Sequence, residues 1–237
     1  MVNTPVKTPD SIGDGRPGET PAVREERHPL GPAWRWGSVA FLAVWAPTYA
    51  VYWGWKNFLA LCDVAAALGC VGLLRGNRLL VSSQALPAVV VGALWATDVG
   101  ARLTTGKHLF GGTEYMWNER VPLPVRLLSL FHLGLPLAFL LALRRMGYDR
   151  RALALQTAVN AAVLVAARLT GDAGRNLNYA FRDPIFGRSW GPAPEHLVAV
   201  LLGTVVLVYL PTHAAFTRWL PAAPAPRRAP DPDSAPV

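Results

Sequence analysis

Cys62, Asp63, Asp98 and His132 are side chains capable of chemistry that lie within, or at the end of, long apolar stretches of the sequence. Ionisable groups are costly in lipid, and in an apolar stretch they mark a functional site by default. A thiol beside a base can act as a nucleophile, and a carboxylate beside an imidazole orients it as a general base. We therefore expect Cys62, Asp63 and His132 to be catalytic residues.

Asp63 and His132 each lie about five residues, or roughly 8 Å of helix, below the same end of two apolar stretches. This shared depth predicts that the two side chains meet. The alternative is an Asp–His pair that only joins helices, with Cys62 as a small packing residue. Cys62 and Cys70 lie eight residues apart on one predicted helix. Their separation of about 12 Å excludes a disulfide between them.

The chain needs an apolar environment, because 52% of its 237 residues are hydrophobic and only 16% are charged. A soluble domain has roughly a quarter charged residues. Most runs approach the ~17–25 residues that cross a bilayer. We expect an all-α polytopic membrane protein, with a bundle over 34–219 and disordered tails at 1–33 and 220–237. The six predicted spans are 36–52, 58–74, 79–96, 127–143, 152–167 and 197–216.

Short basic loops set the predicted orientation. Two arginines lie in the loop 75–78 and four in the loop 144–151. Short loops rich in Lys and Arg stay in the cytoplasm, which with six spans places both termini there as well. The long loops 97–126 and 168–196 then face outward. Heavy use of Arg, Ala, Val, Gly and Pro suggests a bacterial plasma membrane.

The two long loops carry polar side chains that could bind a substrate. Loops of this length are usually functional or disordered, and arginine suits an anionic lipid head group. The alternative is nonspecific contact with lipid phosphates. No HExxH motif or zinc-type Cys pair occurs, so we expect membrane lipids as partners, with no metal, cofactor or nucleic acid. The candidate substrate-binding residues are Asp98, Arg102, His108, Glu114, Asn178 and Tyr179.

Four short motifs carry a family resemblance over about 57–213. They are Leu59-Ala60-Leu61-Cys62-Asp63, His132, Asn178-Tyr179-Ala180-Phe181 and Gly191-Pro192-Ala193-Pro194. The chain resembles a family of small bacterial integral membrane proteins of unassigned function, which is distantly similar to a eukaryotic transmembrane acyltransferase family that uses a cysteine and a histidine. The resemblance implies that Cys62 accepts the acyl group, that His132 is its base, and that Asn178 and Tyr179 cover the site.

The sequence leaves two classes of function open. One is a membrane-embedded enzyme that modifies a lipid by acyl transfer at an outer-face site. The other is a non-enzymatic transporter or a structural or accessory membrane subunit. Transporters often contain internal repeats, and the two halves of this chain show no convincing similarity to each other. An accessible cavity at Asp63 and His132 would favour the enzyme, whereas a sealed pair would favour the structural role.

Overall fold

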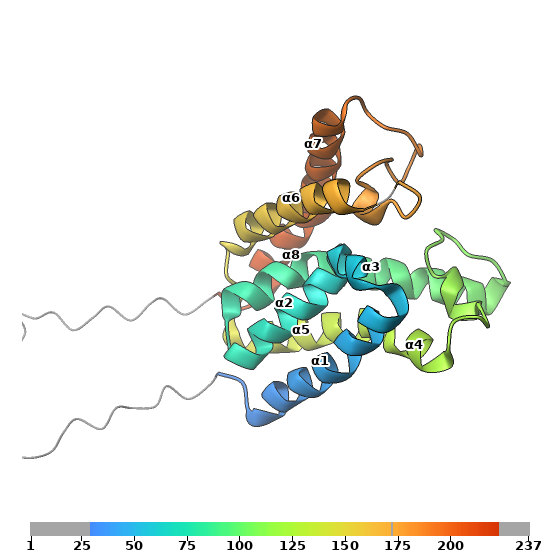
Figure 1. The fold of residues 1–237 in the computed structure, drawn as a ribbon. Coiled ribbons are helices and arrows are strands. Elements are labelled where there is room, and N and C mark those ends of the chain that lie inside the picture. Colours follow the sequence, from blue (N-terminus) through green and yellow to red (C-terminus); the bar gives the residue numbers. More distant parts are fainter. Residues whose placement is uncertain (1–28, 172, 223–237) are drawn as a thin grey trace, which may run out of the picture.

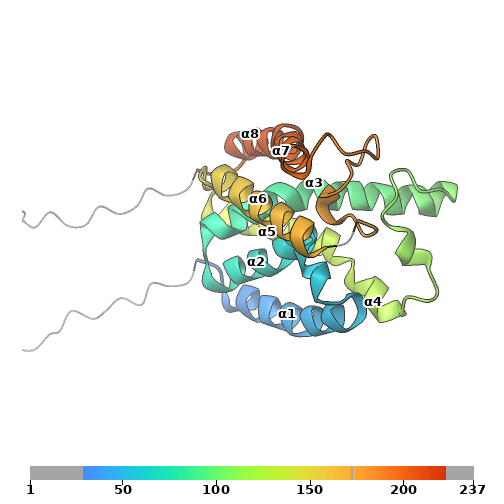
Figure 2. The same cartoon turned by 45° about the horizontal axis from the view of Figure 1, so that its top comes forward.

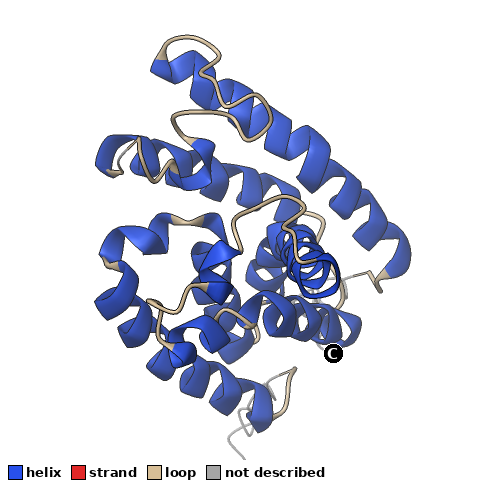
Figure 3. Cartoon of the chain, turned by 90° about the vertical axis from the view of Figure 1, so that its right-hand side faces the viewer, coloured by secondary structure: helices blue, strands red, loops and turns tan. Residues whose placement is uncertain are grey.

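The computed structural model describes residues 29–171 and 173–222, which fold into helices joined by loops, with no strand in these ranges (Figures 1 and 3). The prediction of an all-α fold is confirmed. Most of the predicted tails, 1–33 and 220–237, lies outside the described residues. The helices are α1 (Pro32–Trp53), η1 (Trp55–Leu59), α2 (Leu61–Arg75), α3 (Arg78–Thr105), η2 (Glu114–Trp117), α4 (Leu123–Leu128), α5 (Phe131–Met146), α6 (Ala152–Thr170), η3 (Leu177–Tyr179), α7 (Ala193–Thr204), η4 (Val205–Tyr209) and α8 (Leu210–Trp219).

Within the described ranges, four helical segments are long and apolar enough to cross a membrane. They are Arg78–Thr105, Leu123–Met146, Ala152–Thr170 and Ala193–Trp219. These segments contain the last four predicted spans. The first two predicted spans correspond to α1, in which Trp, Tyr and Pro residues dilute the aliphatic ones, and to α2, which has only 15 residues. A helix of that length is about 22 Å long, less than the ~30 Å of a hydrocarbon core.

The third predicted span, 79–96, was too short. Helix α3 runs on to Thr105, because small and β-branched residues continue the helical pattern until Gly106 ends it with φ 75°. Asn77 caps the other end by accepting a hydrogen bond from the Leu80 amide at 3.0 Å. Asp98 therefore lies inside α3, seven residues before its end, and does not end the helix as expected.

The last predicted span, 197–216, is a composite helix. It begins earlier, at Ala193, and ends later, at Trp219. Between α7 and α8 the chain takes one π-helical turn, η4, whose wider spacing brings the buried Tyr209 against Gln156 of α6. Tyr209 accepts a hydrogen bond from the Gln156 amide nitrogen at 3.3 Å. Of the α7 residues only His196 is buried, and the helix lies on the side of the bundle opposite α1 (Figures 1 and 2).

The short basic loops and both ends of the described chain meet at one end of the bundle. Arg78 lies 3.9 Å from the Asp149 carboxylate, which joins the loop after α2 to the loop after α5. Arg145 lies over the ring of Trp34 near the start of α1, 5.8 Å from its centroid. The Tyr148 amide donates to the Pro221 carbonyl at 2.8 Å. These contacts put four segments that were predicted to share one side of the membrane on the same end of the structure.

Close packing of α2, α3 and α5 forms the core of the bundle. Phe139 is fully buried, and its ring occupies the space that a side chain at Gly69 would need. Small residues allow helices in membranes to approach in this way. On α6, Gln156 and Asn160 are also fully buried. The amide-bearing face of α6 therefore packs against neighbouring helices.

Candidate active site

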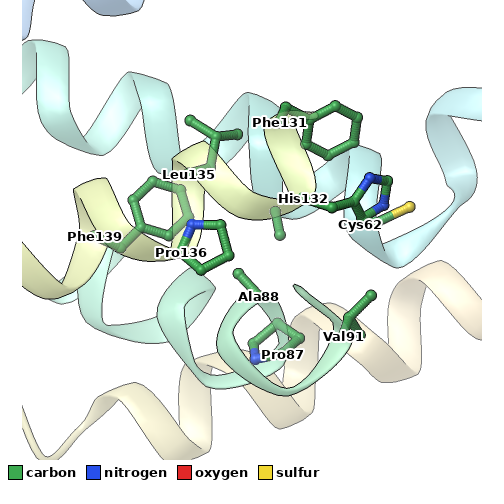
Figure 4. A pocket seen from close by; sticks show the side chains of 10 residues that line it. Cys62, Pro87, Ala88, Val91, Phe131, His132, Leu135, Pro136 and Phe139 are labelled. Carbon is green, nitrogen blue, oxygen red and sulfur yellow. The ribbon is translucent and has the colours of Figure 1, made fainter. Parts of the chain in front are cut away.

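Cys62 and His132 line the same small pocket between α2, α3 and α5 (Figure 4). Cys62 comes from the first turn of α2, and His132 from the first turn of α5. The rest of the lining is apolar, with Val91 from α3 and Phe131 from α5 among its members. The pocket has an accessible volume of about 20 Å³, enough for about one water molecule. The thiol and the imidazole therefore share a nearly dry space.

The hydrogen bond of His132 fixes which ring nitrogen is available. Its Nδ1 lies 2.9 Å from the Ser129 carbonyl oxygen, which can only accept, so Nδ1 carries the proton. Nε2 of the neutral ring is then left as the proton acceptor. The ring also stacks against Trp95, with centroids 5.5 Å apart and planes 4° apart, and against Phe131 at 4.1 Å. His132 is thus held in one orientation and one tautomer.

Asp63 lies beside this pocket without lining it, and its side chain does not pair with His132. Its Oδ2 accepts a hydrogen bond from Asn57 Nδ2 at 2.6 Å, and its Oδ1 lies 3.8 Å from the Cys62 sulfur, within reach of the thiol proton. The expected meeting of Asp63 and His132 is wrong in this respect, because α2 turns Asp63 toward η1 and turns Cys62 toward the pocket. Asp63 is 1% exposed, so it is sealed between helices, which favours a structural role for this residue, whereas Cys62 and His132 line the pocket.

Asn178 holds the start of the helix that carries Cys62. Its Oδ1 accepts from the Leu61 amide at 2.8 Å, and its Nδ2 donates to the Leu59 carbonyl at 2.6 Å. A long-range side chain thus takes the place of a local N-cap, because Ala60 at the N-cap position has no side-chain oxygen. Asn178 has the left-handed φ of 54° that asparagine tolerates. Its observed contacts position Cys62, and a role in substrate binding stays a prediction.

Arg175 and Asn57 extend this junction between the second long loop and α2. Arg175 donates from Nη2 to Asn57 Oδ1 at 2.9 Å, while Asn57 donates to Asp63. Tyr179, by contrast, is 49% exposed, and its carbonyl accepts from His196 Nε2 at 2.9 Å. The second loop therefore lies over the Cys62 end of α2, and Tyr179 is the member of the predicted site that it leaves open to a ligand.

Sequence reasoning missed a set of aromatic and hydroxyl residues around His132. Trp95 donates from its indole nitrogen to the Tyr115 hydroxyl at 3.1 Å, which ties the first long loop to the histidine. Tyr49 on α1 is hydrogen-bonded at 2.8 Å to the hydroxyl of Ser129, the residue whose carbonyl binds His132. Tyrosine and tryptophan near the ends of apolar spans are typical of the membrane interface, so their residue types and positions do not mark them as part of a site.

Asp98 organises the first long loop. Its Oδ1 accepts hydrogen bonds from the Leu109, Phe110 and Gly111 amides, at 2.7, 2.6 and 3.1 Å. Its Oδ2 is bonded to the Thr113 hydroxyl and to His108 Nδ1, the latter at 2.9 Å. Asp98 is 1% exposed. These bonds satisfy both oxygens of the carboxylate within the protein, so Asp98 and His108 have a structural role in holding the loop. Substrate binding by these two residues stays a prediction.

Arg102, in the last turn of α3, and Glu114, in η2, also lie near this loop. The Arg102 guanidinium lies over the Trp117 ring, 5.8 Å from its centroid, and Glu114 accepts from the Gly112 amide at 2.7 Å. Glu114 is exposed. Among the described residues, no group of three His, Cys, Asp or Glu side chains is arranged to hold a metal ion. The site is therefore described by its protein groups alone.

Comparison with known proteins adds no relative. No protein-family model, curated protein or solved structure matches this chain. The chemistry must be argued from the geometry itself: a thiol and a tautomerically fixed imidazole in one apolar pocket, beneath two anchored loops. Such a pair can take up and release a proton while the sulfur forms and breaks a bond to an acyl carbon.

Proposed function

We propose that this protein is a membrane-embedded acyltransferase that moves an acyl group between lipids through a thioester on Cys62. The observation that carries the proposal is the shared pocket of Cys62 and His132. The lone pair at Nε2 of His132 supports its role as base, because Nδ1 is bonded to Ser129. The Cys62 and His132 segments resemble a bacterial membrane family of unassigned function, and its distant similarity to a cysteine- and histidine-dependent acyltransferase family points in the same direction.

The reaction needs an acyl ester as donor and a hydroxyl group as acceptor. His132 Nε2 takes the thiol proton as the Cys62 sulfur attacks the ester carbonyl. The carbon–oxygen bond of the donor breaks, and its alkoxide takes the proton from His132. The acceptor hydroxyl then gives its proton to His132 and attacks the thioester, which releases the Cys62 thiolate to be reprotonated. One ester is consumed and one is formed, so the sequence is balanced without a cofactor.

The proposed setting is a bacterial plasma membrane crossed six times, with both termini in the cytoplasm and the site toward the outer face. Four apolar helical segments support a membrane protein. The two remaining crossings would be α1 and the combination of η1 with α2, because α2 alone is too short. The gathering of the basic loops at one end supports the orientation. The outer segments then include Asn178 and Tyr179, near the head-group region of the outer leaflet.

A test of this function uses the purified full chain in vesicles that contain a labelled phospholipid and an unlabelled lysophospholipid. Transfer of the labelled acyl chain should proceed with the unmodified protein and fall at least about a thousandfold in Cys62→Ala, since nucleophile loss removes the covalent route. His132→Gln should also fall sharply. Leu202→Ala, on the exposed face of α7 and outside the lining of the pocket, is the control and should keep its activity. Unchanged transfer in both Cys62→Ala and His132→Gln would overturn the proposal.

A second candidate function is passage of a small polar solute through the bundle. It is favoured by the buried amides of Gln84, Gln156 and Asn160, which have oxygen or nitrogen atoms with no hydrogen-bond partner among the described residues. Unpaired buried polar groups are costly, and they persist where function requires them. If this function holds, Asn160→Leu would abolish uptake of a small polar solute by vesicles that contain the protein. If the enzyme proposal holds, the same change would leave acyl transfer intact.

A further inference from the structure

A second, larger cavity adjoins the pocket of Cys62 and His132. It is a groove of about 410 Å³ between α1, α2 and α5. Phe131 and Leu135 line both spaces, so these two side chains form a common wall. From Phe131 the groove follows α5 to Ala138, a distance of about 10 Å along the helix. Its volume lies within the ~300–1,000 Å³ range of ligand pockets.

The groove is apolar along its length. The hydroxyl of Ser38 is one of the few polar groups near it, and that hydroxyl donates to the Trp34 carbonyl at 2.8 Å. The Ser38 hydroxyl is therefore already hydrogen-bonded within the protein and needs no polar group from a ligand. Gly37 on α1 and Gly134 on α5 lie opposite open space, because a Cβ atom added to either would meet no protein atom within 4 Å. These glycines leave room for an occupant without polar groups.

The surroundings identify the class of occupant. The helices on either side expose apolar residues to the exterior, Val44 on α1 and Leu133 and Leu137 on α5. In a membrane the groove is therefore next to hydrocarbon chains. Along α2 it reaches Cys70, eight residues beyond Cys62, or about 12 Å deeper. A chain whose carbonyl group reaches Cys62 would thus run down the groove toward the centre of the bilayer.

We propose that the groove between α1 and α5 binds the acyl chain of the lipid whose carbonyl group reacts at Cys62, and that Phe131 and Leu135 must shift to join the two spaces. This inference rests on the proposed acyl transfer. It adds selection for the length of the acyl chain, because the length of the groove limits how many methylene groups can be buried. Each further buried methylene strengthens binding until the groove is filled.

The test uses photocrosslinking of the full chain with Cys62→Ala, so that turnover cannot consume the probe. The protein is placed in vesicles of phosphatidylethanolamine and phosphatidylglycerol that contain a phospholipid with a diazirine in its acyl chain. Peptides containing Gly37 and Gly134 should be labelled more heavily than the exposed α7 peptide containing Leu202. Gly134→Leu, which fills the groove, should lower groove labelling about tenfold, as expected for displacing roughly two methylenes.

Gly203→Leu on α7 is the matched control, because a side chain there also meets no protein atom within 4 Å and Gly203 does not line the groove. Groove labelling should survive that change. Labelling of the groove at the level of α7, or no loss in Gly134→Leu, would overturn the inference. Acyl transfer by the unmodified chain is measured separately. Transfer without groove labelling would leave the enzyme standing, whereas specific groove labelling without transfer would support the binding groove and contradict the enzyme.

Discussion

Gly92 on α3 lies against the backbone of His132 on α5 so closely that a methyl group at Gly92 would overlap the His132 carbonyl oxygen. The same methyl group would come within 2.8 Å of the Pro136 ring. The backbone of the proposed base can therefore take this position because residue 92 on the facing helix is a glycine. Backbone atoms cannot move aside as the tip of a flexible side chain can, so this contact does not tolerate a larger residue at position 92.

Gly92→Ala should push α3 and α5 apart at His132. Overpacking of this kind costs about 1–3 kcal/mol, which predicts a lower melting temperature and a reduced rate of acyl transfer. Gly100→Ala is the control on the same helix, since a side chain at Gly100 meets no protein atom within 4 Å. A Gly92→Ala protein as stable and active as the Gly100→Ala protein would show that this close approach is not required.

Removal of the Asn178 side chain should loosen the first turn of α2 and misplace Cys62. Loss of a helix cap costs about 1 kcal/mol. We expect Asn178→Ala to lower kcat more than it raises KM, and to change the rate at which Cys62 reacts with a thiol reagent in folded protein. Asn118→Ala removes a cap within the first long loop, where Asn118 accepts from the Arg120 amide at 3.0 Å, and should leave Cys62 reactivity unchanged.

The sequence predicted the helical class, and it placed Cys62 and His132 near the same end of their helices, for physical reasons. Long apolar runs have few alternatives to helices in a membrane. The pairing of Cys62 with His132 followed from depth alone, since both lie one or two turns from the same end of their helices. Depth does not fix rotation about the helix axis, which is why Asp63 was expected to face His132 and instead faces Asn57.

The remaining contacts depend on loops whose paths are not encoded in a local pattern. Asn178 reaches Leu61 across more than a hundred residues, and Tyr115 reaches Trp95 from a loop with no helical or strand periodicity. The extension of α3 past Ala96 was missed because polar Thr97 and Asp98 read as the end of a span. In the structure the Asp98 side chain accepts hydrogen bonds from backbone amides of the following loop, and the helix continues beyond Asp98.

Asp149 should make the stability of the protein pH-dependent in acid. Hydrogen bonds from Arg151, with Arg78 nearby, lower the pKa of this carboxyl below its usual value. Its stabilising contribution is therefore complete above the unfolded pKa of about 4 and is lost as pH falls through the lower folded pKa. The melting temperature of the unmodified chain should exceed that of Asp149→Asn by a constant amount above about pH 5. The difference should shrink below about pH 4; growth of the difference in acid would contradict this assignment.

The proposed orientation predicts which loops a membrane-impermeant maleimide can reach in intact cells. Single cysteines are placed at exposed Arg150 and Ser189 in a chain that carries Cys62→Ser and Cys70→Ala. Ser189→Cys should react in intact cells, whereas Arg150→Cys should react only after the membrane is permeabilised. Reaction of both in intact cells, or the reverse pattern, would contradict an outer-face site with cytoplasmic basic loops.

The thioester on Cys62 is the central intermediate of the proposed reaction, and mass spectrometry can detect it directly. The purified chain is mixed with vesicles of acyl donor alone, quenched in acid and digested. We expect the peptide containing Cys62 to gain the mass of one acyl group, hydroxylamine to remove that group, and an acceptor lysophospholipid to discharge it. His132→Gln should slow its formation. Acyl transfer that proceeds with no acyl group on Cys62 at any time would contradict the account.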